Sequence, residues 1–265
     1  MTVRAPAVAG LFYPGVPGYL RTFVVDALDQ ARTLAGPGEE APPRALIVPH
    51  AGYVYSGTTA ATAYHLLKNQ SVKHVVIVGP THRVGINGIA LPDADAMATP
   101  LGEVPLWQEG VALALAQPGV CVSEPVHRQE HAIEVHLPFL QVVLPDVDIL
   151  PLAAGWVEPT VMSNVIEAVW QPGTVVIVSS DLSHYLPYAE AQAVDAKTMR
   201  QILALTPDLG HDQACGATGI NGLLRAAAHR SLVPRLVHQC NSGDTAGDKE
   251  SVVGYATVAF REAVA

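Results

Sequence analysis

Short apolar runs rich in β-branched residues recur along this chain, and longer segments with apolar residues at helical spacing lie between them. Three of the runs are apolar at consecutive positions, as expected for strands that helices cover on both faces. The runs lie at 45–49, 74–80, 147–152, 174–181, 235–240 and 251–260, and the helical segments at 57–69, 131–144, 160–170, 187–205 and 215–230. This alternation predicts an α/β fold with a central, mostly parallel sheet flanked by helices on both faces.

The composition is that of a chain able to bury a large core. Of its 265 residues, 49% are hydrophobic and 15% are charged, which suits one large α/β domain or two small ones. The 22 glycines and 21 prolines are spread along the chain rather than gathered in one tract, so we identify no flexible linker. We therefore expect a single domain over residues 1–265.

The charge, the N-terminal stretch and the cysteines argue against several classes of protein. The formal net charge is −9 without a cluster of Lys and Arg, which argues against a nucleic-acid partner because phosphate binding needs concentrated positive charge. The stretch MTVRAPAVAGLFYPG has no long apolar run, which argues against a signal peptide or membrane span. Three cysteines without framework spacing suit reduced thiols, so we expect a cytoplasmic protein.

Polar residues follow four of the predicted strands. His50 comes directly after the first run, in PHAG, and His82 follows the second, in GPTH. Asp181 ends the fourth run and His184 follows it, both in SSDLSH, and Asp244 follows the fifth run in NSGD. Ligands of doubly wound sheets bind beyond the carboxyl ends of the strands, where the loops converge. One histidine at such a position is more often structural than a ligand, but four coincident polar strand ends favour a site.

These residue types predict a metal site. Neutral imidazoles and a carboxylate together bind first-row divalent metals, and two histidines with one carboxylate leave positions open for substrate, water or oxygen. His50, His82 and Asp244 form such a set. Asp181 and His184 would then stand beside the metal, where an imidazole can transfer a proton or orient a ligand. A helix N-cap is an equally good interpretation of Asp181.

Six motifs occur in an order that matches a known family. PHAGYVYSG, GPTH, EHAIEVHLPFL, SSDLSHY, CGATGI and SGDTAGD with VVGYA resemble the Memo family, whose bacterial members are also called AmmeMemoRadiSam system protein B. The resemblance extends from AVAGLFYP to the last strand. The family is similar in fold to the LigB-like class III extradiol dioxygenases, which cleave catechol rings with Fe(II) held by two His and a Glu.

The resemblance implies that His50 and His82 are metal ligands and that Fe(II) is the expected metal. The third ligand is less well defined, because the animal protein of the family has a cysteine in the last motif. Motif alignment favours Asp244, which restores the dioxygenase pattern of ligands. Cys240 is the alternative. A thiolate from Cys240 would make the site softer and favour copper or zinc.

Further residues of the same motifs are candidates for the wall of the metal cleft. The segment RQEHAIEVHLPFL lacks the two histidines flanking a glutamate that a zincin helix needs, so we reject a metalloprotease. The resemblance suggests that this helix borders the cleft, with Glu130, His131 and His136 behind the metal ligands or facing the substrate, although solvated, capping or packing roles fit them equally well. Tyr53 and Cys215 are candidates from the first and fifth motifs. Cys215 is either a reactive thiol at a helix start or a small residue packed near the cleft.

Two functions from different classes fit these observations. The first is a metal-dependent, oxygen-using oxidoreductase that acts on a small molecule such as an aromatic diol. The second is a non-catalytic metal-binding protein whose cleft receives a small molecule or a peptide and which works with a radical-SAM modification system. The proton-transfer groups Asp181 and His184 favour the enzyme. The sequence leaves the substrate, the metal and the oligomeric state open.

Overall fold

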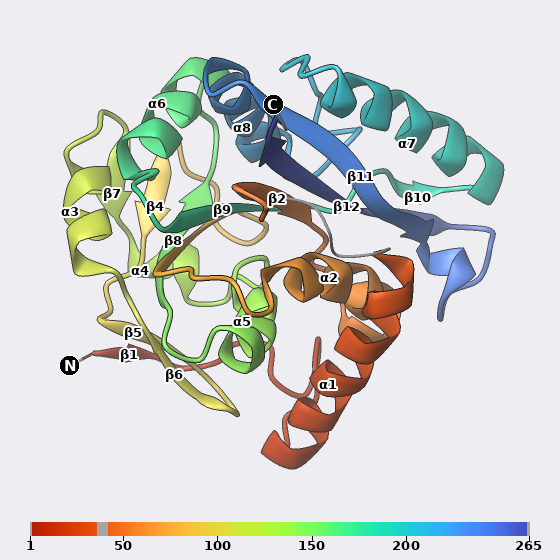
Figure 1. Ribbon diagram of the computed structural model, residues 1–265, viewed down its shortest axis with the longest axis horizontal. Helices are drawn as coiled ribbons and strands as arrows, with labels where there is room; N and C mark the ends of the chain where they lie inside the picture. Colours follow the sequence, from red (N-terminus) through yellow and green to blue (C-terminus); the bar gives the residue numbers. More distant parts are fainter. Residues whose placement is uncertain (1, 36–41, 264–265) are drawn as a thin grey trace.

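A computed structural model describes residues 2–35 and 42–263, and its centre is a large twisted sheet (Figure 1). Within the described residues the strand order is β10-β12-β2-β9-β3-β8-β4-β7, and β11 pairs with β12. The strands span His184–Leu186 (β10), Val252–Glu262 (β12), Ala45–Val48 (β2), Thr174–Ser179 (β9), His74–Pro80 (β3), Asp148–Ala154 (β8), Ile89–Leu91 (β4), Val120–Val122 (β7) and Leu232–Asn241 (β11). All six apolar runs of the sequence therefore coincide with strands.

The middle of the sheet is parallel and its margins are mixed. Strands β2, β9, β3 and β8 pair in parallel, as do β4 and β7. Antiparallel pairing joins β12 to β2, β10 and β11, and joins β4 to β8. The predicted α/β fold is confirmed, and its parallel part contains the strands that lead to His50, His82 and Asp181.

Helices cover both faces of the sheet, which explains why its central strands are apolar at consecutive positions. Leu46 and Val48 of β2 belong to one apolar cluster and Ala45 and Ile47 to the other, because successive side chains point to opposite faces. The first cluster contains α1 (Pro17–Leu34), α2 (Tyr53–Leu67) and α5 (Leu137–Val143). The second contains α3 (Gln108–Leu115), α6 (Pro159–Val169), α7 (Tyr188–Leu203) and α8 (Ala217–His229).

Some elements fall outside the sequence-based prediction. A small second sheet combines β1 (Val3–Arg4), β5 (Ala96–Thr99) and β6 (Gly102–Pro105). The remaining short elements are α4 (Glu124–His127), η1 (Glu134–His136) and η2 (Ser242–Asp244). The segment at 131–144 forms a helix only from residue 134 onward. In the described part of the chain, no helix has the length and apolar character needed to cross a bilayer.

Glu134 fixes the N-terminal segment against the body of the protein. Its buried carboxylate accepts hydrogen bonds from Arg4 Nη1 (2.7 Å), Tyr13 Oη (2.6 Å) and the backbone N–H groups of Ala7 and Val8. Charge-assisted hydrogen bonds of this kind are stronger than neutral ones. The segment between Val8 and Tyr13 is thereby held next to the carboxyl ends of the central strands.

Candidate metal centre

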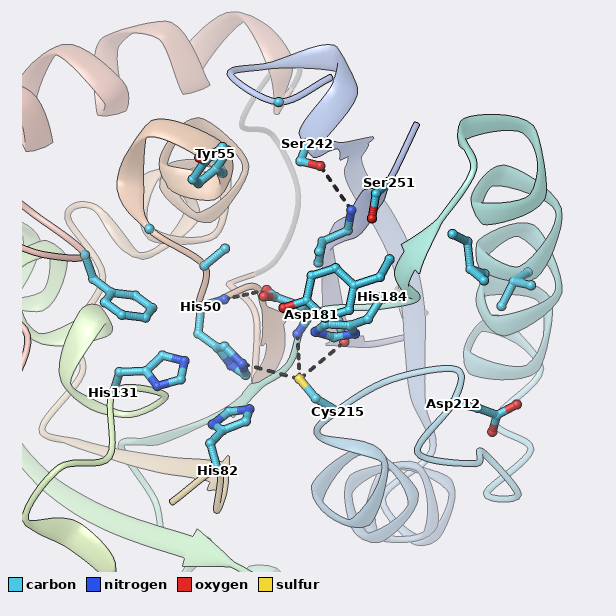
Figure 2. Close-up of a pocket in the computed structure, with 18 of the residues that line it drawn as sticks. His50, Tyr55, His82, His131, Asp181, His184, Asp212, Cys215, Ser242 and Ser251 are labelled. Carbon is cyan, nitrogen blue, oxygen red and sulfur yellow. Dashed lines mark hydrogen bonds between the residues drawn. The ribbon is translucent and has the colours of Figure 1, made fainter. Parts of the chain in front are cut away.

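A cavity of about 1170 Å³ opens at the carboxyl ends of the central strands, as the sequence predicts for a ligand site (Figure 2). His50 follows β2, His82 follows β3, and Asp181 and His184 follow β9. Cys215 joins them from the segment before α8. Side chains from distant parts of the sequence thus line one cavity.

His50 lies at the base of this cavity and is almost completely buried. Its backbone N–H donates to Asp181 Oδ1 at 2.8 Å, and its Nδ1 lies 2.7 Å from Ser179 Oγ. Its Nε2 lies 3.3 Å from the sulfur of Cys215. Burial, together with the neighbouring histidines, holds the pKa of His50 well below the usual value. The imidazole is therefore neutral, which is the form that binds metals.

Glu130 orients His82. One carboxylate oxygen accepts the backbone N–H of His82 at 2.6 Å, and the other accepts its Nδ1–H at 2.8 Å. Burial acts to raise the pKa of Glu130, but the hydrogen bonds from His82 outweigh it and hold the pKa at about 2. A carboxylate bound to Nδ1–H leaves Nε2 as the free ligand atom, the arrangement common behind metal-binding histidines.

Cys215 brings a thiol to the two histidines. Its sulfur accepts the backbone N–H of Asp181 at 3.3 Å. Burial, followed by the charge of Asp181, raises the pKa of the thiol to about 12, which favours the packed thiol over the reactive one of the two interpretations of Cys215. Gly216 permits the approach of this segment to β9, because a Cβ at residue 216 would lie 2.6 Å from the backbone oxygen of Ser179.

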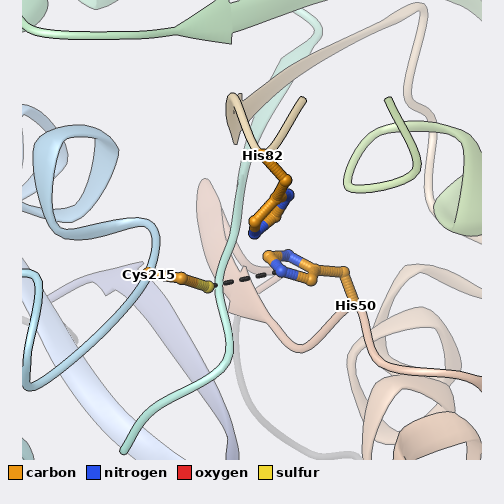
Figure 3. Close-up of side chains that lie close together, drawn as sticks. All are labelled: His50, His82 and Cys215. Carbon is orange, nitrogen blue, oxygen red and sulfur yellow. Dashed lines mark hydrogen bonds between the residues drawn. The ribbon is translucent and has the colours of Figure 1, made fainter. Parts of the chain in front are cut away.

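His50, His82 and Cys215 form a group that could hold a metal ion (Figure 3). One ligand atom from each lies within 4.8 Å of the other two. Two imidazoles and a thiol suit zinc, copper and iron. A second group, His82, Glu130 and His131, meets the same criterion, but one oxygen of Glu130 already accepts His82 Nδ1–H and the backbone N–H groups of His131 and Ala132. Its carboxylate is therefore committed to holding His82.

The structure does not bring Asp244, the third ligand favoured by the sequence, to this group. Asp244 is exposed on η2, where its carboxylate accepts Tyr188 Oη at 2.6 Å and the backbone N–H of Asn241 at 3.0 Å. It completes a capping box with Asn241, and this local role explains its place in the motif. The alternative, Cys240, also lies elsewhere, with its sulfur 3.1 Å from Thr59 Oγ1.

Asp181 and His184 both line the cavity, as the sequence predicts. Burial raises the pKa of Asp181 to about 7, against the hydrogen bonds from the backbone N–H groups of His50 and Ala51. The N-cap interpretation of Asp181 is wrong, because β10 and not a helix follows it. His184 begins β10 and is half-buried, and its pKa is lowered by burial.

The other predicted cleft residues separate into two sets. His131 lines the cavity, with its ring stacked on that of His82 at 4.5 Å between centroids. His136 and Tyr53 are buried beneath the cavity wall. Tyr53 Oη donates to the backbone oxygen of Val135 at 2.7 Å, so Tyr53 has a packing role. His136 contacts Ser179 Oγ through Nε2 at 2.8 Å.

The outer part of the cavity combines apolar and acidic side chains. Leu11 and Tyr185 contribute to its wall and are 81% and 75% exposed. Glu190, Asp212 and Asp248 line it as well, whereas no Lys or Arg is among the described residues of the lining. Neither these rim residues nor Ser179 stood out from the sequence. The sequence feature that could have pointed to Ser179 is the SSD motif, in which it is the first residue.

Comparison with known proteins supports a single family over nearly the whole chain. The family model described as "Memo-like protein" matches residues 4–259. A "MEMO1 family protein" of Archaeoglobus fulgidus is 35% identical, over 98% of this chain and 100% of the relative. Relatives of the same description from Aquifex aeolicus and Desulfurococcus amylolyticus are 34% and 31% identical, each over 98% of this chain and at least 99% of their own length.

A solved structure shares the fold. The crystal structure of the uncharacterized protein JW3007 from Escherichia coli K12 aligns with a TM-score of 0.50 over 81% of this chain and 98% of that chain. The sequence identity is 14%, so the likeness concerns the fold alone. It is consistent with the LigB-like fold expected from the sequence.

Proposed function

The chain belongs to the Memo family, and we propose that it is a metal-dependent oxidoreductase that uses oxygen to convert a small molecule in its cavity. One observation carries the proposal. One ligand atom each of His50, His82 and Cys215 lies within 4.8 Å of the other two, and all three residues line a large cavity, so these residues would hold a metal within reach of a ligand bound in the cavity.

In this proposal the ligand atoms are Nε2 of His50, Nε2 of His82 and the sulfur of Cys215. A first-row divalent metal supplies Lewis-acid and redox chemistry when bound. Binding would require loss of the thiol proton, because the thiolate is the form that binds metals. The affinity should therefore rise with pH.

Fe(II) is the metal we assign to the oxidoreductase, since iron with two histidines and open positions supports oxygen chemistry. A thiolate makes this donor set softer than two histidines with a carboxylate, so copper and zinc are the competing ions. Metal analysis of protein purified under nitrogen, without added metal, distinguishes the three. Iron in a 1:1 ratio supports the assignment, and zinc or copper in its place contradicts it.

His184 and Asp181 are the proposed proton-transfer residues. Both side chains lie on the cavity wall beside the candidate ligands (Figure 2). His184 is half-buried at the cavity wall, and an imidazole in such a position can act as a general acid or base. Asp181 also accepts the backbone N–H of His50, so it holds the segment that carries this ligand.

Oxygen uptake by the iron-loaded protein tests the proposed reaction. The substrate panel should contain neutral, anionic and amine-bearing catechols, because the described residues of the lining include carboxylates and no Lys or Arg. Uptake that depends on a diol and on His50 supports the oxidoreductase. The His50→Ala protein, loaded under the same conditions, is the matched control.

The cavity itself favours a second candidate, a metal-binding partner in a radical-SAM modification system. A volume of about 1170 Å³ exceeds what one aromatic ring requires, since drug-sized ligands occupy pockets of roughly 300–1,000 Å³. The exposed side chains of Leu11 and Tyr185 at its edge would suit a peptide. If the protein binds metal but consumes no oxygen with any diol, the partner function replaces the oxidoreductase.

A further inference from the structure

The hydroxyl of Ser179 is a meeting point of three buried hydrogen bonds behind the candidate metal centre. Ser179 is the last residue of β9 and is fully buried. Its Oγ lies 2.6 Å from the backbone oxygen of Ala132, 2.7 Å from His50 Nδ1 and 2.8 Å from His136 Nε2.

Counting protons assigns the direction of each contact. A carbonyl oxygen only accepts, so the single hydroxyl proton of Ser179 must be donated to Ala132. Ser179 Oγ then has only lone pairs left for the two imidazoles. Nδ1 of His50 and Nε2 of His136 must therefore both carry protons and donate them to Ser179.

Tyr64 completes the arrangement from the other side of His136. Its hydroxyl lies 2.6 Å from His136 Nδ1, and its ring stacks on Phe139 with 4.8 Å between centroids. Burial lowers the pKa of His136 to about 3, so this histidine is neutral. With the His136 proton on Nε2, Nδ1 of His136 accepts a hydrogen bond from the Tyr64 hydroxyl. The hydrogen bonds then run without a break from Tyr64 through His136 and Ser179 to His50.

We propose that Ser179 is a positioning residue that holds His50 in the Nδ1–H tautomer, with His136 and Tyr64 fixing the orientation of the Ser179 hydroxyl from behind. The unprotonated Nε2 of His50 then faces Cys215 and His82. In free histidine the Nε2–H tautomer predominates, whereas in a protein the hydrogen bond at one ring nitrogen decides which nitrogen is protonated. Ser179 thus prepares the ligand atom before any metal binds.

The tautomer can be read directly in the metal-free protein. Long-range ¹H–¹⁵N correlation spectra of ¹⁵N-histidine protein report which nitrogen of each ring is protonated. We expect His50, assigned by its loss in His50→Ala, to show the Nδ1–H pattern. In Ser179→Ala the population of the Nε2–H tautomer of His50 should increase and that of the Nδ1–H tautomer should decrease. Ser163→Ala removes another buried hydroxyl, in α6, and should leave the His50 pattern unchanged.

Zinc titration gives the consequence for the metal site, and only this second measurement rests on the proposed function. Loss of an outer hydrogen bond to a ligating histidine typically weakens metal binding about 10- to 100-fold, which we expect for Ser179→Ala and not for Ser163→Ala. An Nε2–H pattern for His50 in the wild type overturns the inference, as does an unchanged pattern in Ser179→Ala. Absence of zinc binding to the wild type would instead overturn the proposed metal function.

Discussion

The carboxylate of Glu130 accepts two hydrogen bonds from one residue, the backbone N–H and the ring Nδ1–H of His82, at 2.6 and 2.8 Å. Backbone and ring are thereby fixed together, so the direction of Nε2 does not depend on a freely rotating side chain. Glu130 is itself 2% exposed. Because His82 follows β3 and Glu130 precedes α5, these two hydrogen bonds join the end of β3 to the segment before α5.

Replacement of Glu130 by Gln should weaken metal binding about 10- to 100-fold without unfolding the protein. An amide has one accepting oxygen, so its NH₂ group would face a backbone N–H that the carboxylate now satisfies. Isothermal titration with Zn²⁺ or, under nitrogen, Fe(II) measures the effect. Glu124→Gln, at an exposed carboxylate bound to Arg128, is the control and should bind as the wild type does. Equal affinity of Glu130→Gln and Glu124→Gln would contradict the orienting role.

The identity of the third ligand can be decided by two substitutions. Cys215→Ala should lower Zn²⁺ affinity by more than the about 10- to 100-fold that an outer contact contributes, because it removes a donor atom. Asp244→Asn should leave the affinity unchanged, since the Asp244 carboxylate is bound to Tyr188 and Asn241. His50→Ala should abolish stoichiometric binding, and it serves as the reference for the loss of one metal ligand. The reverse order, with metal lost in Asp244→Asn and kept in Cys215→Ala, would restore the ligand set expected from the sequence.

His184→Ala should keep the bound metal and lose turnover. A positioned imidazole that transfers protons typically contributes 10²- to 10⁴-fold in rate, whereas the ligand group of His50, His82 and Cys215 does not include His184. Metal content and oxygen uptake on the same preparation separate the two effects. His229→Ala, at an exposed position near the end of α8, should change neither. Loss of metal from His184→Ala would make His184 a ligand.

Gly254→Ala should destabilise the protein by about 1–3 kcal/mol, the usual cost of added volume in a packed interior. A Cβ at residue 254 would lie 2.0 Å from the Asp195 carboxylate, which accepts the backbone N–H of Ser183. Urea unfolding measures the change. Gly18→Ala is the control, because nothing lies within 4 Å of a Cβ there, and in helix α1 it should stabilise by about 0.4–1 kcal/mol. Equal stability of both variants would show that Asp195 moves aside freely.

The sequence predicted the sheet and two of the three candidate ligands for a physical reason. Consecutive apolar residues identify buried strands, and the ends of parallel strands converge, so His50 and His82 could be placed together without a structure. Cys215 lies before a helix rather than at the end of a strand, and no periodicity reports how near a helix start approaches a neighbouring strand. Asp244 also follows a strand that ends at this edge, because β11 is antiparallel to β12 and β12 is antiparallel to β2. Its carboxylate is instead bound to Tyr188 and to the backbone N–H of Asn241, a local capping arrangement that the strand pattern does not report.

His127 should make the stability of the protein fall as the solution is acidified. Its buried Nε2 lies 2.8 Å from the backbone oxygen of Ala90, and burial lowers its pKa to about 4 from about 6.5 in the unfolded chain. As the pH falls, the unfolded chain binds this proton before the folded protein does. The contribution of His127 to the free energy of unfolding is therefore complete above pH 6.5 and is lost between pH 6.5 and 4. At pH 5 the loss amounts to roughly 2 kcal/mol.

His127→Gln should remove this part of the pH dependence, since an amide does not titrate in this range. Urea unfolding of wild type and variant at pH 7.5 and pH 5.0 measures it as the difference between the two pH-induced changes in unfolding free energy. The measurement at pH 7.5 serves as the control, because both side chains are uncharged there and the difference reports packing and hydrogen bonding alone. A variant whose stability falls as steeply as that of the wild type between the two pH values would assign the acid sensitivity to other groups.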